Sequence, residues 1–235
     1  MMANTSYFDL FGRDHLLTML LILVACVALP LFVRRARSTG IERSVAATLC
    51  IVLLLNEALK FAARILVYKL PVEEQLPLHL CAATAFLVAY MLMRRSYAVF
   101  EVAYFWAMGG TLQAILTPDL QAPFPSLYYM VFFFGHGVVM LGVAYAIVVF
   151  RFRPTLKSIV KAMAALAAYA TVIAPLNWLL GTNYLYLCHK PAGTSLIDYL
   201  APWPWYIASL GLIAAVSFVI WWLPFGLLKL RSRQS

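Results

Sequence analysis

Residues 127–150 read LYYMVFFFGHGVVMLGVAYAIVVF and contain no Asp, Glu, Lys or Arg. An α-helix rises about 1.5 Å per residue, so roughly 20 apolar residues cross the hydrocarbon core of a bilayer, which is about 30 Å thick. This stretch is both long enough and apolar enough to cross the bilayer. It therefore predicts a membrane-spanning helix, and the fold depends on how many such stretches accompany it.

Further apolar stretches of similar length lie on both sides of it along the chain. They are residues 15–33, 44–68, 76–93, 97–117, 157–180 and 204–228. With 127–150 they predict an all-α fold, a single polytopic membrane domain over residues 1–235 with seven transmembrane helices. Stretch 76–93 is the shortest and opens at Pro77, a residue that suits the first turn of a helix. A six-helix bundle with one re-entrant stretch is the alternative.

The composition indicates lipid rather than water as the solvent of the chain. Of the 235 residues, 64% are hydrophobic and 11% are charged, whereas soluble domains have about 25% charged residues. In a soluble protein the net charge of +9 would suggest a nucleic-acid partner. Here the basic residues lie in short connections, where they set topology and contact anionic lipid headgroups. No nucleic-acid partner is predicted.

The distribution of Lys and Arg between alternate connections predicts the orientation. The larger set comprises Arg34, Arg35, Arg37, Arg43, Arg94, Arg95, Arg151, Arg153, Lys157, Lys161, Lys229, Arg231 and Arg233. The smaller set comprises Arg13, Lys60, Arg64, Lys69 and Lys190. Basic residues concentrate on the cytoplasmic side of membrane proteins. The N-terminus is therefore predicted outside and the C-terminus in the cytoplasm.

Polar side chains within the predicted spans are unevenly distributed by depth. Such groups are unfavourable in hydrocarbon and usually face the bundle interior or a cavity. Asn56 and Glu57 lie in the middle of stretch 44–68. Those in the predicted outer halves are His15, Lys60, Arg64, His79, Cys81, Gln113, His136 and Asn177, with Asn183 and His189 in the outer connection 181–203. The inner halves have almost nothing comparable. This asymmetry predicts a polar cavity in the outer half of the bilayer.

Three charged residues of stretch 44–68 share one helix face. Glu57, Lys60 and Arg64 are spaced i, i+3 and i+7, so Glu57 is predicted to pair with Lys60. The pair could fix the register of the helices, or it could couple to ion or small-molecule transport. Transport is the weaker interpretation, because the polar residues stop halfway and no inverted repeat is evident.

Cys81 and His136 suit nucleophilic acyl transfer. A cysteine near a helix start can attack an ester carbonyl as a thiolate, while a histidine takes the thiol proton. His79 and Cys81 are two residues apart and point about 200° away from each other on a regular helix, so His136 is the preferred base. Cys81 and His136 both lie roughly 6–8 Å below the membrane interface, at the depth of the phospholipid ester groups. The alternative for Cys81 is a small buried core residue.

A metal site is a further alternative, because histidine is the commonest metal ligand. Its ligands would be His15, His79, His136 and His189, each from a different segment, since no HxxxH or HExxH spacing occurs. The cysteines, Cys26, Cys50, Cys81 and Cys188, include no Cys-x-x-Cys pair. No metal is therefore predicted, and no soluble cofactor, because no phosphate-binding glycine loop is present.

Several motifs resemble those of the bacterial YwaF-like integral membrane proteins. They are LPLHLC at 76–81, GGTLQAILTP at 109–118, His136-Gly137, NYLY at 183–186, Lys190-Pro191 and PWPWY at 202–206. The resemblance extends from His15 to about Tyr206, and the motifs occur in the same order as in that family. YwaF-like proteins are similar, more distantly, to the eukaryotic transmembrane-protein-164 family of phospholipid acyltransferases, in which a membrane-embedded cysteine and a histidine are implicated. A more remote resemblance is to androgen-inducible membrane hydrolases, which cleave fatty-acid esters.

The resemblance implies a lipid-modifying enzyme of the bacterial plasma membrane, with membrane phospholipids as substrate and solvent. Cys81 looks like the counterpart of the implicated cysteine, although its spacing to His79 departs from the eukaryotic Cys-His order. The predicted catalytic residues are Cys81 as nucleophile, His136 as base and His79. The predicted substrate-binding residues are Glu57, Lys60, Asn56, Gln113, Asn183 and His15.

Overall fold

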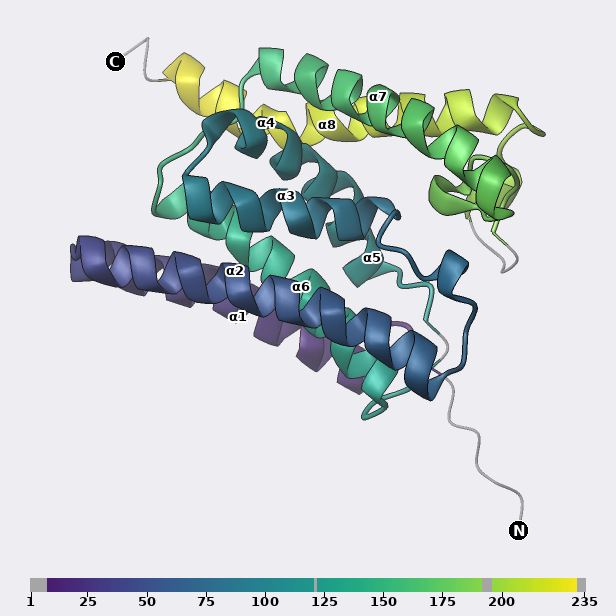
Figure 1. Cartoon of the computed structure of the whole chain (residues 1–235). Helices are drawn as coiled ribbons and strands as arrows, with labels where there is room; N and C mark the ends of the chain where they lie inside the picture. Colours follow the sequence, from purple (N-terminus) through teal and green to yellow (C-terminus); the bar gives the residue numbers. More distant parts are fainter. Residues whose placement is uncertain (1–7, 121, 192–195, 232–235) are drawn as a thin grey trace.

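Long antiparallel helices make up the protein, whose structure is a computed structural model that describes residues 8–120, 122–191 and 196–231 (Figure 1). The α-helices are α1 (Arg13–Ala36), α2 (Thr39–Ala62), α3 (Leu80–Arg94), α4 (Tyr97–Trp106), α5 (Leu112–Leu116), α6 (Leu127–Val148), α7 (Leu156–Leu180) and α8 (Trp205–Arg231). Two π-helices, η1 (Ala63–Val67) and η3 (Ala107–Thr111), extend α2 and join α4 to α5. The 3₁₀ helices are η2 (Val72–Glu74), η4 (Tyr184–Tyr186) and η5 (Leu196–Tyr199).

The all-α prediction is confirmed, and the described residues contain no strand. With η1 counted as part of α2, and α4, η3 and α5 as one span, each predicted stretch contains a helix. Six of these segments are long and apolar enough to cross a membrane. The chain passes back and forth, so that α1 begins at one end of the bundle and α8 ends at the other (Figure 1). Which end faces outside stays a prediction, and Arg233 lies outside the described residues.

Helix α3 differs from its prediction. It begins at Leu80 rather than at 76, and its 15 residues extend over roughly 22 Å at about 1.5 Å per residue. Pro77 does not start the helix, because His79, two residues later, still has an extended backbone and is the N-cap of α3. The carbonyl of Leu78 instead accepts a hydrogen bond from Tyr169 of α7 at 2.9 Å. Helix α3 is therefore too short to span the hydrocarbon core by itself.

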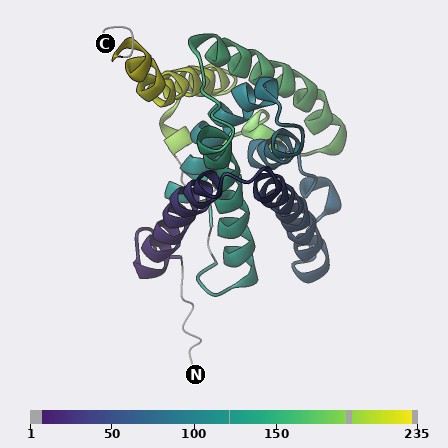
Figure 2. The same ribbon diagram turned by 90° about the vertical axis from the view of Figure 1, so that its left-hand side faces the viewer.

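The helices pack around α3 and α6. Figure 2 shows α1 and α2 on either side of α6, and α3 packs against α2, α4 and α6. Helix α7 packs against α4 and α8 on the far side of the bundle. The largest fully buried side chains include Met91, Phe100, Phe105 and Tyr145. These contacts place the start of α3 between the end of α2 and the first half of α6.

The turn between α1 and α2 and the turn between α3 and α4 contain the same Arg-Ser pair. Helices α1 and α3 end at Arg37 and Arg95, which have left-handed backbones. The next residues, Ser38 and Ser96, are the N-caps of α2 and α4, and each hydroxyl accepts a backbone N–H. A capping serine satisfies an N–H group that the helix itself leaves unpaired. The two Arg-Ser pairs therefore end one helix and start the next.

Candidate functional site

Cys81 lies in the first turn of α3 and is half-buried. Its thiol is beside the hydroxyl of Thr111, and the charges of Lys60 and Glu57 are close enough to act on it. Tyr186 is also close enough to interact with Cys81 electrostatically. Side chains from α2, η3 and the connection after α7 therefore lie within electrostatic or hydrogen-bonding range of this thiol on α3. We call these five residues the Cys81 site.

Thr111 is fully buried, and its hydroxyl has no hydrogen bond of ordinary geometry. A threonine inside a helix normally bonds to the carbonyl three or four residues earlier, but Thr111 lies in the π-helix η3 and does not. A buried hydroxyl without a partner costs about 1–3 kcal/mol. The hydroxyl is therefore free to donate to a group bound beside Cys81. The sequence gives little sign of this role beyond the preceding Gly109 and Gly110.

The predicted pairing of Glu57 with Lys60 is confirmed. The Lys60 Nζ lies 2.6 Å from one carboxylate oxygen of Glu57 and 2.5 Å from the other. The Lys60 side chain is 21% exposed and that of Glu57 is 10% exposed. The pair therefore neutralises itself within the bundle, beside the thiol.

Arg64 adds a second cation at the end of α2. Its guanidinium donates to the Tyr128 hydroxyl at 2.7 Å and to Gln75 Oε1 at 3.3 Å. Its Nε is buried and has no partner. The charges of Arg64 and Lys60 both act on His79 and His136. Lys60 therefore lies within electrostatic range of all three predicted catalytic residues.

His136 has a defined proton arrangement. Its Nδ1 lies 2.7 Å from the Phe132 carbonyl, and because a carbonyl only accepts, the neutral ring has its proton on Nδ1 and leaves Nε2 as the basic nitrogen. The preceding Gly135 lies against Asn56, where an added Cβ would be 2.2 Å from Nδ2. The amide of Asn56 is 5% exposed and has no hydrogen bond to any described residue. Within the described chain, no hydrogen bond joins Cys81 to either histidine.

His79 is the N-cap residue of α3 and contacts the connection after α7. Its ring lies 4.9 Å from the ring of Tyr184 and 6.0 Å from that of Tyr186, centroid to centroid. Asn177 fixes this connection by accepting from the Tyr184 N–H at 2.8 Å and donating to the Tyr184 carbonyl at 2.9 Å. Leu185 and Tyr186 have left-handed φ values of 58° and 54°, which cost roughly 1–2 kcal/mol each. These contacts hold Tyr184 beside His79 and Tyr186 near Cys81 despite the strain.

Among the predicted substrate-binding residues, His15 and Gln113 form their hydrogen bonds with residues outside the Cys81 site. His15 is 1% exposed, and its Nε2 donates to the Ile115 carbonyl at 2.8 Å. Its Nδ1 accepts from the Phe11 N–H at 3.0 Å, so both nitrogens are already used in joining α1 to α5. Gln113 is exposed and donates to Thr117 Oγ1 at 2.6 Å.

Asn183 organises the connection after α7. Its side-chain oxygen accepts from the Cys188 N–H at 3.0 Å, and its amide donates to the His189 carbonyl at 2.7 Å. His189 is exposed, so the four histidines do not converge as the metal alternative requires. Among the described residues, no group of three or more His, Cys, Asp or Glu side chains could hold a metal ion.

A buried acid in the other half of the bundle corrects the predicted polar asymmetry. Glu101 of α4 is 3% exposed, accepts from Ser158 Oγ at 2.7 Å and forms an ion pair with Lys161 of α7. Glu101 is not among the predicted polar residues. Because its carboxylate is fully paired, Glu101 connects α4 to α7 and leaves no group free for chemistry.

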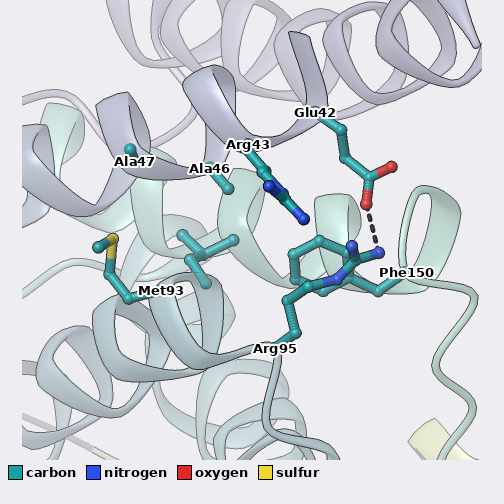
Figure 3. Close-up of a pocket in the computed structure, with 8 residues that line it drawn as sticks. Glu42, Arg43, Ala46, Ala47, Met93, Arg95 and Phe150 are labelled. Atoms are coloured by element: carbon teal, nitrogen blue, oxygen red, sulfur yellow. Dashed lines mark ion pairs between the residues drawn. The ribbon is translucent and has the colours of Figure 1, made fainter. Parts of the chain in front are cut away.

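Two pockets lie at the end of the bundle opposite Cys81. One, of about 300 Å³, is lined by Glu42, Arg43, Ala46, Ala47, Leu92, Met93, Arg95 and Phe150 (Figure 3). The other, of about 470 Å³, is lined by Arg153, Pro154, Thr155, Leu156, Trp222, Phe225, Gly226 and Leu228. Neither includes Cys81, His79 or His136. The Cys81 site is therefore defined by its convergent side chains and not by either pocket.

The antiparallel helices and the polar site at one end of them define a multi-pass membrane protein. Residues 10–222 match the sequence profile of the TMEM164 family, and the chain belongs to this family. An uncharacterized protein of Treponema pallidum (strain Nichols) is 28% identical over 119 residues, which are 51% of this chain and 50% of that protein. The match thus spans about half the length of this relative. No solved structure matches the chain.

Proposed function

We propose that the protein is an acyltransferase of the bacterial plasma membrane that moves acyl chains between glycerophospholipids, with Cys81 as nucleophile. The observation that carries this function is the position of a half-buried thiol beside a buried hydroxyl that has no hydrogen-bond partner apart from this thiol. Lys60 and Arg64 add cations within reach of both nearby histidines. Membership of the TMEM164 family is compatible with lipid chemistry, as is the narrower resemblance to YwaF-like proteins.

The reaction has two steps that exchange one bond for another. The Cys81 sulfur attacks an ester carbonyl of the donor lipid, a C–S bond forms, the ester C–O bond breaks, and the lysolipid leaves. His136 Nε2 takes the thiol proton and passes it to the departing oxygen. The hydroxyl of a second lysolipid then attacks the thioester and restores the thiol. The hydrogen bond between thiol and base forms with substrate bound, as is common for catalytic contacts that are long in empty sites.

The remaining groups of the region suit a phospholipid. The tetrahedral intermediates carry a negative charge on the former carbonyl oxygen, and Thr111 supplies a hydroxyl donor for it. The unpaired Nε of Arg64 provides a cationic donor for the lipid phosphate. The Asn56 amide, which also lacks a partner, lies on the α6 side of this region next to Gly135.

Liposomes test this function directly. The purified protein is reconstituted with a phosphatidylcholine whose acyl chain carries an isotope label, together with lysophosphatidylethanolamine and no acyl-CoA. We expect labelled phosphatidylethanolamine to form. Labelled free fatty acid alone would indicate an ester hydrolase instead. If the label stays in the donor, the protein is not an enzyme of this kind, and ion-coupled uptake sensitive to Glu57→Gln would support transport.

Replacing His136 with alanine should reduce transfer by about 10²–10⁴-fold, the usual contribution of a general base. The matched control is His15→Ala, because His15 is a buried histidine whose two nitrogens bind backbone groups. His15→Ala should lower the thermal stability but leave transfer per folded molecule unchanged. Equal rates per folded molecule in the two variants would exclude His136 as the base.

Thr111→Val separates catalysis from packing, because valine keeps the shape of threonine and removes only its hydroxyl. Loss of an oxyanion donor typically costs 10²–10³-fold in rate, so we expect a decrease of this order. The melting temperature should stay equal or rise, because the hydroxyl has no partner to lose. An unchanged rate, measured in the same liposome assay, would rule out the proposed donor.

A further inference from the structure

The pocket between α2 and α3 lies away from the Cys81 site, where α2 begins and α3 ends. Figure 3 shows Arg43 and Arg95 reaching into this pocket from the two helices, with the ring of Phe150 beside the guanidinium of Arg95. We call this cavity, lined by the eight residues named above, the α2–α3 pocket. Most of the basic connections of the chain lie at this end of the bundle, the one predicted to be cytoplasmic.

The charged part of the pocket is preorganised for an anion. The Arg95 guanidinium lies 4.6 Å from the centroid of the Phe150 ring and forms an ion pair with Glu42. Its side chain is 50% exposed, and a guanidinium has five N–H donors, only part of which one carboxylate can use. Arg43 is exposed and has no partner among the described residues. Two arginines and one glutamate leave the pocket with an excess of one positive charge.

The deeper part of the pocket is apolar. One turn further into the bundle, α2 contributes Ala46 and Ala47, and α3 contributes Leu92 and Met93. The two alanines leave space that longer side chains would fill. Charged groups at the helix ends and apolar groups toward the centre match the polarity of a phospholipid lying along the two helices. Basic pockets between membrane helices are known binding sites for anionic headgroups.

We propose that the α2–α3 pocket binds an anionic phospholipid, with its phosphate on Arg43 and Arg95 and the first part of its chains against Ala46, Ala47 and Met93. A free phosphate ion would share the headgroup contacts and would lack the apolar ones. The site is independent of chemistry at Cys81, because no residue lines both.

Thermal unfolding of the purified protein in detergent distinguishes these ligands. The probes are a short-chain phosphatidylglycerol, phosphatidylcholine with the same chains, and inorganic phosphate. We expect the melting temperature to rise with phosphatidylglycerol and to change little with the other two. Arg43→Gln should weaken the phosphatidylglycerol response about tenfold in midpoint concentration, which corresponds to about 1.4 kcal/mol, and Ala47→Phe should weaken it by filling the apolar part.

Arg34→Gln is the matched control, because Arg34 is an exposed arginine in the last turn of α1 at the same end and does not line the pocket. It should respond to phosphatidylglycerol like the wild type. Equal responses of the Arg34 and Arg43 variants would overturn the site in favour of general surface attraction. A wild-type response to inorganic phosphate as large as that to phosphatidylglycerol would overturn the lipid as its ligand. Because Arg43 is exposed and unpaired, Arg43→Gln should fold, and its melting temperature without lipid checks this.

Discussion

Replacing Cys81 with alanine is expected to lower acyl transfer in liposomes by about 10³-fold or more, to the level of protein-free membranes. Without the sulfur no thioester can form, and loss of a nucleophile removes nearly all the rate that the catalytic groups supply together. The measurement is the labelled phosphatidylethanolamine formed per folded molecule. A second readout is direct: after incubation with the donor lipid alone, mass spectrometry should find the acyl chain on Cys81 of the wild type, in a form that hydroxylamine removes.

Cys26→Ala is the matched control, because Cys26 is a half-buried cysteine in the middle of α1. This variant should retain transfer, and its Cys81 should carry the same acyl adduct as Cys81 of the wild type. If Cys81 only fills space in the core, Cys81→Ala will lower stability while each folded molecule keeps its full rate. That result would remove the proposed nucleophile, and with it the role given to Thr111.

The sequence predicted the helices well because their main requirement is local. An apolar stretch must match the thickness of the hydrocarbon core, and six of the seven stretches contain a segment long enough to do so. The start of α3 was predicted four residues too early, because the conformation there depends on a contact with a distant helix. The Leu78 carbonyl bonds to Tyr169 of α7, a partner that no local pattern reveals.

The sequence predicts at what depth the candidate side chains lie, but not the direction in which they point. His15, Gln113 and His136 occupy similar predicted depths, yet His15 binds backbone groups and Gln113 faces outward. Which way each points depends on the rotation of its helix within the bundle, which hydrophobicity alone leaves open. The i, i+3 spacing did predict the pairing of Glu57 with Lys60, because it lies within one helix.

The contacts that the sequence did not predict involve irregular or distant segments. Thr111 lies in a π-helix, a local insertion that often marks functional sites and has no recognised sequence pattern here. Arg64 lies in the other π-helix, and its hydroxyl partner is Tyr128, which is 64 positions away. Glu101 is visible in the sequence as an acid within stretch 97–117, but its pairing with Ser158 and Lys161 of α7 is not.

Replacing Gly142 with alanine should destabilise the protein by about 1–3 kcal/mol, the usual cost of overpacking a core. An added Cβ at Gly142 of α6 would lie 2.5 Å from Val88 Cγ1 and 3.3 Å from Leu92 Cδ1. Val88 and Leu92, both on α3, are 0% and 1% exposed, so neither has space into which to move. Gly211→Ala in α8 is the control, because a Cβ there meets nothing within 4 Å. It should be neutral or slightly stabilising, since alanine favours helix over glycine. Thermal unfolding of the two variants in the same detergent provides the comparison.

The same substitution should also slow acyl transfer, because α3 carries Cys81 and α6 carries His136. A Cβ at Gly142 can be accommodated only if the two helices separate, and such a shift lengthens the path between thiol and base at their other ends. Misplacement by about 1 Å can cost 10²-fold in rate. We therefore expect Gly142→Ala to lose activity per folded molecule, whereas Gly211→Ala keeps it. Equal melting temperatures in these two variants would mean that α3 and α6 pack less closely than the structure indicates, and the positions of Cys81 and His136 would then not depend on this contact.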